Sequence, residues 1–338
     1  GPDSSGSFPG PACYNLGGKH PTVTDSDLVL GYLDAENFLG GDMKLEKKLA
    51  EQAIKTFIAE PMKISVLEAA WAIHEIVTEN MSQAASIHAL EKGRKIEKYT
   101  MIPIGGAGPV HACSLMSKMN LNKMISPPDA GVASAIGMTA SPNSFELVQA
   151  DMQQLELLNF TKMKKAFLDM EKKGTKLLLQ TGTNKKHISI NNSALMRYVG
   201  QGYEIEVPLN KEILSLKNIK NIKLEFEKVY QNLFGRIEKM PMEIMSWRTI
   251  ASGPLPNFSL NFNVKKKSLL KEKKRKVFFG GKNFNDTIVL DRSSLSKTFK
   301  SIGPLIIEER ESTLVIPPNF KVQMHESGNL IINNIVKD

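Results

Sequence analysis

The chain has 338 residues, of which 41% are hydrophobic and 23% charged, so it can bury two sizeable cores and is not disordered as a whole. No apolar run approaches the ~20 residues that a membrane span needs, and no secretory signal is evident. The two cysteines, Cys13 and Cys113, form no CxxC pair. This argues against a disulfide framework or a zinc knuckle and fits a reducing, cytoplasmic setting.

The net charge of +9 raises the question of nucleic-acid binding. Part of the excess lies in one basic run, which consists of Lys265, Lys266, Lys267, Lys271, Lys273, Lys274, Arg275 and Lys276. Few aromatic residues interleave with these cations, so the run lacks the stacking platform of a nucleic-acid groove. We therefore expect a solvated linker or loop rim, with neither nucleic acid nor a membrane as partner.

The first residues read as a loop followed by a short helix. Because the chain begins at Gly1 without a methionine, we expect it to start inside a longer polypeptide. Residues 1–21 are dense in Gly, Pro and Ser, and Cys13 within them is expected to be buried. Asp25 or Ser26 then caps a helix that Gly31 ends. A carboxylate facing a phosphate-bound metal remains an alternative for Asp25 or Asp27.

Two amphipathic helices are predicted next. The first covers residues 44–59 and should end at Pro61. The second begins with the capping box Ser65 to Glu68 and stops at Gly93. His74 and His88 lie on or near this helix, but not at ligand spacing, so we expect packing or surface roles. The six histidines show no metal-ligand pattern, and no metal ligands are predicted.

A glycine turn follows an apolar run of residues 99–104 that is short enough for a buried strand. Three glycines in four residues, Gly105 to Gly108, then precede Pro109 and a helical pattern over residues 110–119. Without Cβ atoms, such a turn lets the backbone approach a ligand, and free N–H groups lie at the helix start. A nucleotide is the obvious candidate, and a tight turn that touches nothing is the alternative. His111 is close to this site, in either a packing role or a polar contact.

The remaining elements indicate an α/β region and then a β-rich end. A strand at residues 123–126 and a helix at 132–140 follow the glycine turn, and this order implies a parallel sheet. Residues 151–180 read as a lysine-rich helix interrupted at Gly174. We then expect a strand, a turn and a strand over residues 195–208, a helix at 225–234 and a strand at 244–251. Period-two patterning over residues 277–336 completes the chain.

Several sequence blocks in the right order resemble the C-terminal half of the hydantoinase A / 5-oxoprolinase / acetone carboxylase β-subunit family. They are Gly1–Gly6, Pro9–Tyr14, Pro21–Asp25, Leu28–Gly31, Asn37–Gly41, Gly105–Ala112, Pro127–Val132, Ser134–Gly137, Arg197–Gly202, Gly303–Pro304, Ile307–Glu309 and Ser312–Thr313.

The resemblance implies an α/β fold with part of an actin, sugar-kinase and Hsp70-like nucleotide-binding lobe over residues 1–150. An α+β domain with a β-rich end would occupy residues 151–338. ATP, with Mg²⁺, would be the cofactor. The nucleotide-contacting residues would be Gly105, Gly106, Ala107, Gly108 and Pro109, with Asp25 as a weaker candidate. No catalytic residue is assigned.

The resemblance also implies ATP-dependent opening of a cyclic amide such as 5-oxoproline or a hydantoin. The partners would be a hydantoinase B-type subunit or domain and a missing N-terminal half that carries the phosphate loop, so the chain alone would be incomplete as an enzyme. The ATP-handling subunit of an acetone- or acetophenone-type carboxylase is one alternative. A catalytically inactive, basic binding or scaffold module is another.

Overall fold

The computed structural model describes residues 3–210, 218–257 and 273–335. The chain forms two compact units that are not contiguous in sequence. One comprises residues 1–91, 95–136 and 260–338, and the other comprises residues 92–94 and 137–259. The expected division at residue 150 therefore differs from the division by contacts, because the C-terminal strands pack with the N-terminal helices. We propose residue 150 as the boundary between two domains that follow one another in the sequence.

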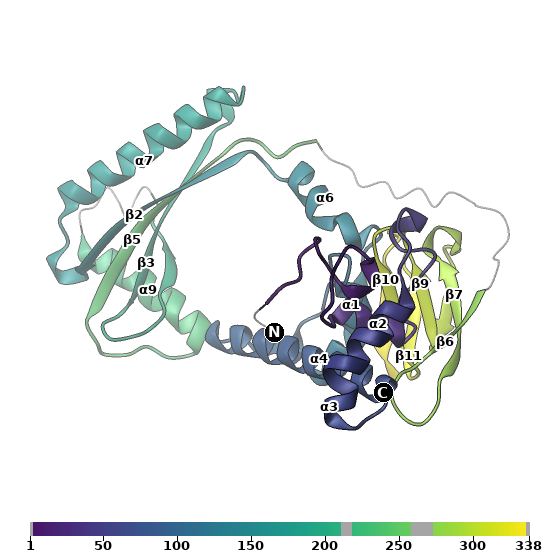
Figure 1. Ribbon diagram of the computed structural model, residues 1–338. Coiled ribbons are helices and arrows are strands. Elements are labelled where there is room, and N and C mark those ends of the chain that lie inside the picture. The colour runs from purple at the N-terminus through teal and green to yellow at the C-terminus, as the bar shows by residue number, and fades with distance from the viewer. Residues whose placement is uncertain (1–2, 211–217, 258–272, 336–338) are drawn as a thin grey trace. The chain divides into compact units, whose positions relative to one another are not determined.

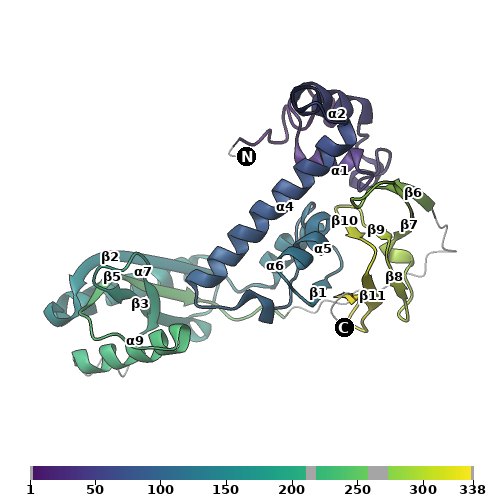
Figure 2. The same cartoon turned by 90° about the horizontal axis from the view of Figure 1, so that it is seen from below.

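The first unit has an N-terminal group of helices (Figure 1). Its helices are α1 (Val23–Val29), α2 (Lys47–Ile54), α3 (Glu60–Met62), α4 (Val66–Glu91) and α5 (Gly108–Lys118), and α6 (Ala133–Ala140) continues into the second unit. Helix α4 packs against α1 and α5, and Figure 2 shows its length. Buried Ala69 and Ala70 on α4 have small side chains, and the Ser26 hydroxyl donates to the Ala70 carbonyl oxygen at 2.7 Å. These contacts bring α1 close to α4.

Two four-stranded sheets complete the first unit. One has the order β1-β12-β11-β8 and is antiparallel throughout, with β1 (Lys123–Ser126), β8 (Lys300–Ile302), β11 (Phe320–Met324) and β12 (Leu330–Asn334). The other has the order β10-β9-β7-β6, with β6 (Lys273–Val277), β7 (Asn285–Asp291), β9 (Leu305–Glu308) and β10 (Thr313–Ile316). Strands β9 and β10 read as continuous apolar runs because they are buried on both faces.

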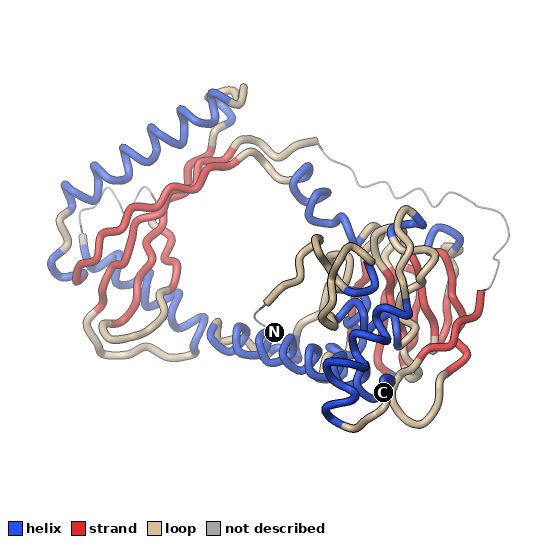
Figure 3. The backbone as a smooth tube through the Cα atoms, viewed as in Figure 1, coloured by secondary structure: helices blue, strands red, loops and turns tan. Residues whose placement is uncertain are grey.

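In its described residues, the second unit has an antiparallel sheet that packs with long helices (Figure 3). The sheet order is β2-β5-β3-β4, with β2 (Ser144–Gln154), β3 (Ser189–Tyr198), β4 (Ile205–Pro208) and β5 (Met242–Ser252). Helices α7 (Phe160–Gln180) and α9 (Ile219–Phe234) share one hydrophobic core with these strands. The rings of Phe167 and Trp247 meet edge to face at 5.4 Å, and those of Tyr198 and Phe226 at 5.0 Å. The core therefore joins both helices to the sheet.

Several predicted boundaries are correct. Ser65 and Glu68 form the capping box of α4, with the Glu68 N–H donating to the Ser65 hydroxyl at 3.1 Å. The strand–turn–strand over residues 195–208 is the antiparallel pair β3 and β4. The β-rich end contains β6 to β12. Each of these is specified by local sequence, namely a cap or an alternating pattern.

Other predictions were wrong for tertiary reasons. In the described residues, the predicted parallel sheet is reduced to two parallel pairings, strand β7 with β9 and the isolated bridge of Met101 with Met124. Residues 99–104 form no strand, because only Met101 bridges to Met124, while Ile102 and Ile104 are about half exposed. The cap of α1 is Thr22 rather than Asp25 or Ser26. The chain stays helical through a π turn at residues 55–59 and past Pro61 to Met62. Pro61 lies in the first turn of the short helix α3, where a missing N–H is tolerated.

The predicted helix over residues 151–180 was also partly wrong. Residues 151–154 belong to β2, where they continue the ladder with β5 after a bulge. Gly174 does not interrupt α7. It lies where the helix touches the sheet, so that a Cβ atom would come within 2.7 Å of the Ala251 Cβ. Glycine is needed there for space, and the helix continues through it.

Among the described residues, no helix combines the length and apolarity needed to span a membrane.

Gly174→Val should lower the free energy of unfolding by about 1–3 kcal/mol, because the added side chain collides with Ala251 and Leu147. Denaturant unfolding monitored by circular dichroism measures this loss. Gly137→Ala is the matched control, since a Cβ at Gly137 in α6 meets nothing within 4 Å. Equal stability of the Gly174 variant and the wild type would show that α7 is not packed tightly on β5.

Candidate functional site

A cavity of about 220 Å³ lies in the first unit. Four segments line it, namely helix α1 with residue 14, the loop of residues 33–39, the glycine turn with the start of α5, and the β9–β10 connection with its flanks. The lining residues are Tyr14, Thr24, Asp27, Leu33, Asp34, Asn37, Phe38, Leu39, Gly106, Ala107, Val110, Glu308, Glu309, Arg310, Glu311, Ser312 and Thr313. The volume is below the ~300–1,000 Å³ of complete small-molecule sites. The cavity therefore has room for only part of a nucleotide-sized ligand.

The glycine turn faces this cavity through two of its residues. Gly106 and Ala107 line the cavity, whereas Gly105, Gly108 and Pro109 do not. A Cβ at Gly106 would lie 3.2 Å from the Glu311 carbonyl oxygen, so the turn passes close to the β9–β10 connection. Helix α5 begins here with Ala107 as its N-cap and no side-chain cap. Pro109 has no N–H and the Val110 N–H donates to the Ala107 carbonyl oxygen at 3.1 Å, so the start of α5 offers fewer backbone donors than an ordinary helix N-terminus.

Asp25 has a different position from the one that a nucleotide contact requires. Its carboxylate accepts hydrogen bonds from the N–H groups of Ala12, Cys13 and Thr22 at 3.2, 2.8 and 2.9 Å. The Thr22 hydroxyl also donates to it at 2.8 Å. Asp25 is fully buried and does not line the cavity. It fixes the first loop to α1, and the neighbouring Asp27 is the residue that reaches the cavity.

Cys13 is buried beside Asp25, as expected. Burial, followed by the negative charge of Asp25, raises the pKa of the Cys13 thiol far above its usual range. A thiol in this environment stays protonated and is a poor nucleophile. Cys13 therefore packs the loop rather than supplying chemistry.

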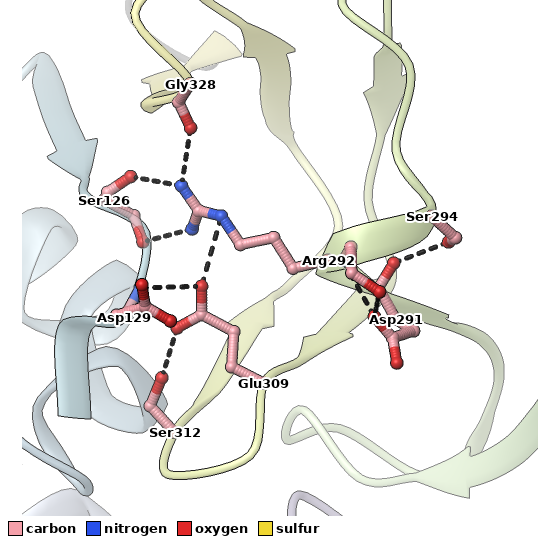
Figure 4. Close-up of polar contacts among 9 residues, drawn as sticks. Ser126, Asp129, Asp291, Arg292, Ser294, Glu309, Ser312 and Gly328 are labelled. Carbon is pink, nitrogen blue, oxygen red and sulfur yellow. Dashed lines mark hydrogen bonds and ion pairs between the residues drawn. The ribbon is translucent and has the colours of Figure 1, made fainter. Parts of the chain in front are cut away.

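A buried arginine anchors one wall of the cavity, the β9–β10 connection, to neighbouring segments (Figure 4). The Arg292 Nε lies 3.1 Å from Glu309 Oε1, and its Nη2 donates to the Ser126 and Gly328 carbonyl oxygens at 2.9 and 3.0 Å. Glu309 in turn accepts from the Asp129 N–H at 3.2 Å. Burial lowers the pKa of Arg292, and the facing carboxylate of Glu309 opposes that effect. These contacts join residues 126–129 to the β9–β10 connection.

A second arginine corrects the prediction for the basic run. Arg275 is not a solvated linker residue, because its Nη2 pairs with Asp34 Oδ2 at 2.8 Å and Glu308 Oε1 at 2.6 Å. Lys273, Lys274 and Lys276 are exposed on the same strand, β6. Residues 265–271 of the run lie outside the described residues. Successive side chains of a strand point to opposite faces, so Arg275 points away from the face of Lys274 and Lys276. It therefore meets Asp34 and Glu308, which line the cavity.

These pairs reduce the negative charge of a lining that is rich in carboxylates. Asp34 and Glu308 share Arg275, and Glu309 is paired with Arg292. The remaining lining combines aromatic and aliphatic side chains and backbone of the glycine turn with polar and charged side chains, among which Arg310 pairs with Glu311 at 3.1 Å. Such a surface suits an uncharged, planar or polar group better than a phosphate.

Three ionisable side chains meet below the cavity, on three different helices. They are Asp27 of α1, His74 of α4 and His111 of α5, each no more than 3% exposed. His74 Nδ1 lies 3.6 Å from Asp27 Oδ1, and His111 Nε2 lies 3.4 Å from Asp27 Oδ2. Burial alone would raise the pKa of Asp27, but the contacts with His111 and His74 outweigh it, so this pKa lies below its usual range.

Sequence reasoning missed this cluster. His74 and His111 were expected to have packing or surface roles or, for His111, a polar contact. Asp27 was considered only as an alternative partner of a phosphate-bound metal and no histidine was predicted as a ligand, yet the two imidazoles and the Asp27 carboxylate are all of ligand type. The three residues lie 37 or more positions apart in sequence, so no short motif could reveal them. The one available signal was that Asp27 and His111 each lie beside a predicted helix start.

The chain matches known proteins over nearly all of its length. The family models "Hydantoinase/oxoprolinase" and "Hydantoinase/oxoprolinase C-terminal domain" match residues 1–146 and 150–332. An uncharacterised protein of Methanocaldococcus jannaschii is 31% identical over 98% of this chain and 47% of its own length. The acetophenone carboxylase gamma subunit of Aromatoleum aromaticum is 28% identical over 99% of this chain and 48% of its own.

A solved structure also matches the fold. The crystal structure of the ATP-dependent caprolactamase from Pseudomonas jessenii aligns with a TM-score of 0.73 and 26% identity, over 99% of this chain and 50% of that one. The chain thus spans about half the length of the relatives it matches. The mixed α/β fold is shared with this structure.

Arg292→Met should cost about 3–5 kcal/mol of unfolding free energy, because it leaves the buried Glu309 carboxylate without its cation. Arg310→Met, one residue from Glu309, should cost below about 1 kcal/mol, because its pair with Asp42 is two-thirds exposed. Thermal and urea unfolding of both variants measures the difference. Similar losses in the two variants would contradict the structural role of the buried pair.

Proposed function

Because the chain belongs to the hydantoinase/oxoprolinase family, we propose that it contributes the nucleoside-binding part of an ATP-dependent enzyme that opens a cyclic amide, such as 5-oxoproline or a hydantoin. The observation that carries the proposal is the cavity into which Gly106 and Ala107 present backbone at the start of α5. The similarity to an ATP-dependent caprolactamase supports both the use of ATP and the class of substrate.

The chemistry of the cavity agrees with a nucleoside. Aromatic Tyr14 and Phe38 and the bare backbone of Gly106 offer apolar surface for a base, and carboxylates such as Glu311 offer acceptors for ribose hydroxyls. The cavity is too small for a complete ATP, and most of its charge is negative or paired. The phosphates, with Mg²⁺, would therefore extend beyond these lining residues.

Of the residues expected to contact the nucleotide, Gly106 and Ala107 take direct roles in this proposal. Gly105, Gly108 and Pro109 shape the turn and the first turn of α5. Asp25 acts indirectly by holding the loop around Cys13 against α1. We also propose that residues 1–150 represent part of a lobe of the actin, sugar-kinase and Hsp70 type.

Phosphoryl transfer needs donors and a metal against the β- and γ-phosphates. We propose that these come from a polypeptide equivalent to the half of the relatives that this chain does not span, and that a hydantoinase B-type subunit or domain supplies further parts. The similarity to an acetophenone carboxylase subunit favours one second candidate, the ATP-handling role in a ketone carboxylase. Product analysis with and without bicarbonate and a ketone separates the two activities.

Gly106→Val should reduce ADP and ATP affinity at least about tenfold, because its side chain would occupy ligand space next to Glu311. Isothermal titration calorimetry of the chain combined with its complementary half and B-type partner measures the affinity. Gly202→Val is the control, since a Cβ there meets nothing within 4 Å.

Equal nucleotide affinity of the Gly106 variant and the wild type would show that the turn is only structural. Absence of nucleotide binding by the complete assembly, together with retention on DNA that falls steeply with salt, would support the inactive basic module instead.

A further inference from the structure

We propose that Asp27, His74 and His111 form a binding site for one divalent transition-metal cation of the Zn²⁺ type, separate from any Mg²⁺ that accompanies a nucleotide. The three residues come from α1, α4 and α5, and one ligand atom from each lies within 4.8 Å of the others. Two imidazole nitrogens and one carboxylate oxygen match the preferences of Zn²⁺, Fe²⁺ or Co²⁺. Mg²⁺ prefers six oxygen ligands and fits this set poorly.

The distances fit metal coordination better than direct hydrogen bonding. The Asp27 oxygens lie 3.4 and 3.6 Å from the nearest imidazole nitrogens, beyond the ~2.7–3.2 Å of a good N–H···O bond. Metal–ligand bonds of ~2.0–2.2 Å at a tetrahedral angle place neighbouring ligand atoms ~3.4 Å apart. Each imidazole nitrogen therefore lies near ligand spacing from one Asp27 oxygen, and one ligand atom from each of the three residues lies within 4.8 Å of the others.

Unpartnered buried atoms give a second, independent indication. Among the described residues, the buried side-chain nitrogens and oxygens that lack a hydrogen-bond partner are Asp27 Oδ1, His74 Nδ1 and His111 Nδ1. All three belong to this cluster. Leaving a buried polar atom unpaired costs free energy, so such atoms are rare in folded proteins. A cation would satisfy the Asp27 and His74 atoms at once.

The surroundings resemble those of metal sites in two respects. His74 Nε2 lies 3.3 Å from the Ser114 hydroxyl, which would fix the ring with Nδ1 toward Asp27. Asp27 also lines the cavity, which provides a route for an ion from solvent. The His74 and His111 rings are stacked with centroids 4.8 Å apart, so metal binding should rotate them into a common coordination sphere.

The test titrates the chelator-treated, full chain with Zn²⁺ by calorimetry. We expect one Zn²⁺ per chain, and an at least 100-fold loss of affinity for His74→Gln and for His111→Gln. His88→Gln is the matched control, because His88 is exposed on the same helix as His74, and it should change the affinity less than twofold. Folding of each variant is checked by circular dichroism.

A second measurement needs no variant. Co²⁺ added to the wild-type chain should give the intense visible bands of a four- or five-coordinate ion, and X-ray absorption of the Zn²⁺ form should show two imidazoles. Absence of Zn²⁺ binding, binding that both glutamine variants retain, or the weak spectrum of hydrated Co²⁺ would overturn the proposal. None of these readouts involves a nucleotide, so they fail or succeed independently of the proposed function.

Discussion

The pair of buried Arg292 and largely buried Glu309 is the interaction that fixes one wall of the cavity. Arg292 reaches from the end of β7 to the carbonyl oxygens of Ser126 and Gly328, and Glu309 reaches the Asp129 N–H (Figure 4). The pair thereby links the segment of residues 126–129, the β9–β10 connection and the β11–β12 turn, which are far apart in sequence. A charged pair in this environment is stable only when both members keep their hydrogen bonds, so the connections cannot move independently. Residues 308–313 are consequently held opposite the glycine turn.

The same constraint explains the composition of the lining. Five of its residues are carboxylates, but Arg275 and Arg292 neutralise three of them, namely Asp34, Glu308 and Glu309. In the proposed function, a nucleoside end would meet hydrogen-bond acceptors there without strong repulsion, whereas a triphosphate would meet too few cations. This division of labour fits a chain that spans about half the length of its relatives. The Asp27, His74 and His111 cluster lies beside this cavity and is of different chemistry, since it offers nitrogen ligands.

The family resemblance and the local elements were accessible from the sequence. The capping box at Ser65, the strand pair of residues 195–208 and the β-rich end depend on neighbours within a few positions, and each is present. The glycine turn lies beside a cavity, which receives Gly106 and Ala107 rather than the whole motif. The contact between that turn and a nucleotide stays a prediction.

Long-range pairing was decided only by the tertiary structure. Strand β1 pairs antiparallel with β12, some two hundred residues later, and the expected parallel pairing of β1 is reduced to the bridge between Met124 and Met101. Arg275 sits in a lysine-rich run, yet packing on Asp34 and Glu308 makes it structural. Asp27, His74 and His111 converge because three helices cross. The sequence by itself determined the local elements and the family, because these depend on residues close along the chain. The sheet partners, the buried ion pairs and the histidine cluster required the folded chain, since their members meet only after distant segments pack together.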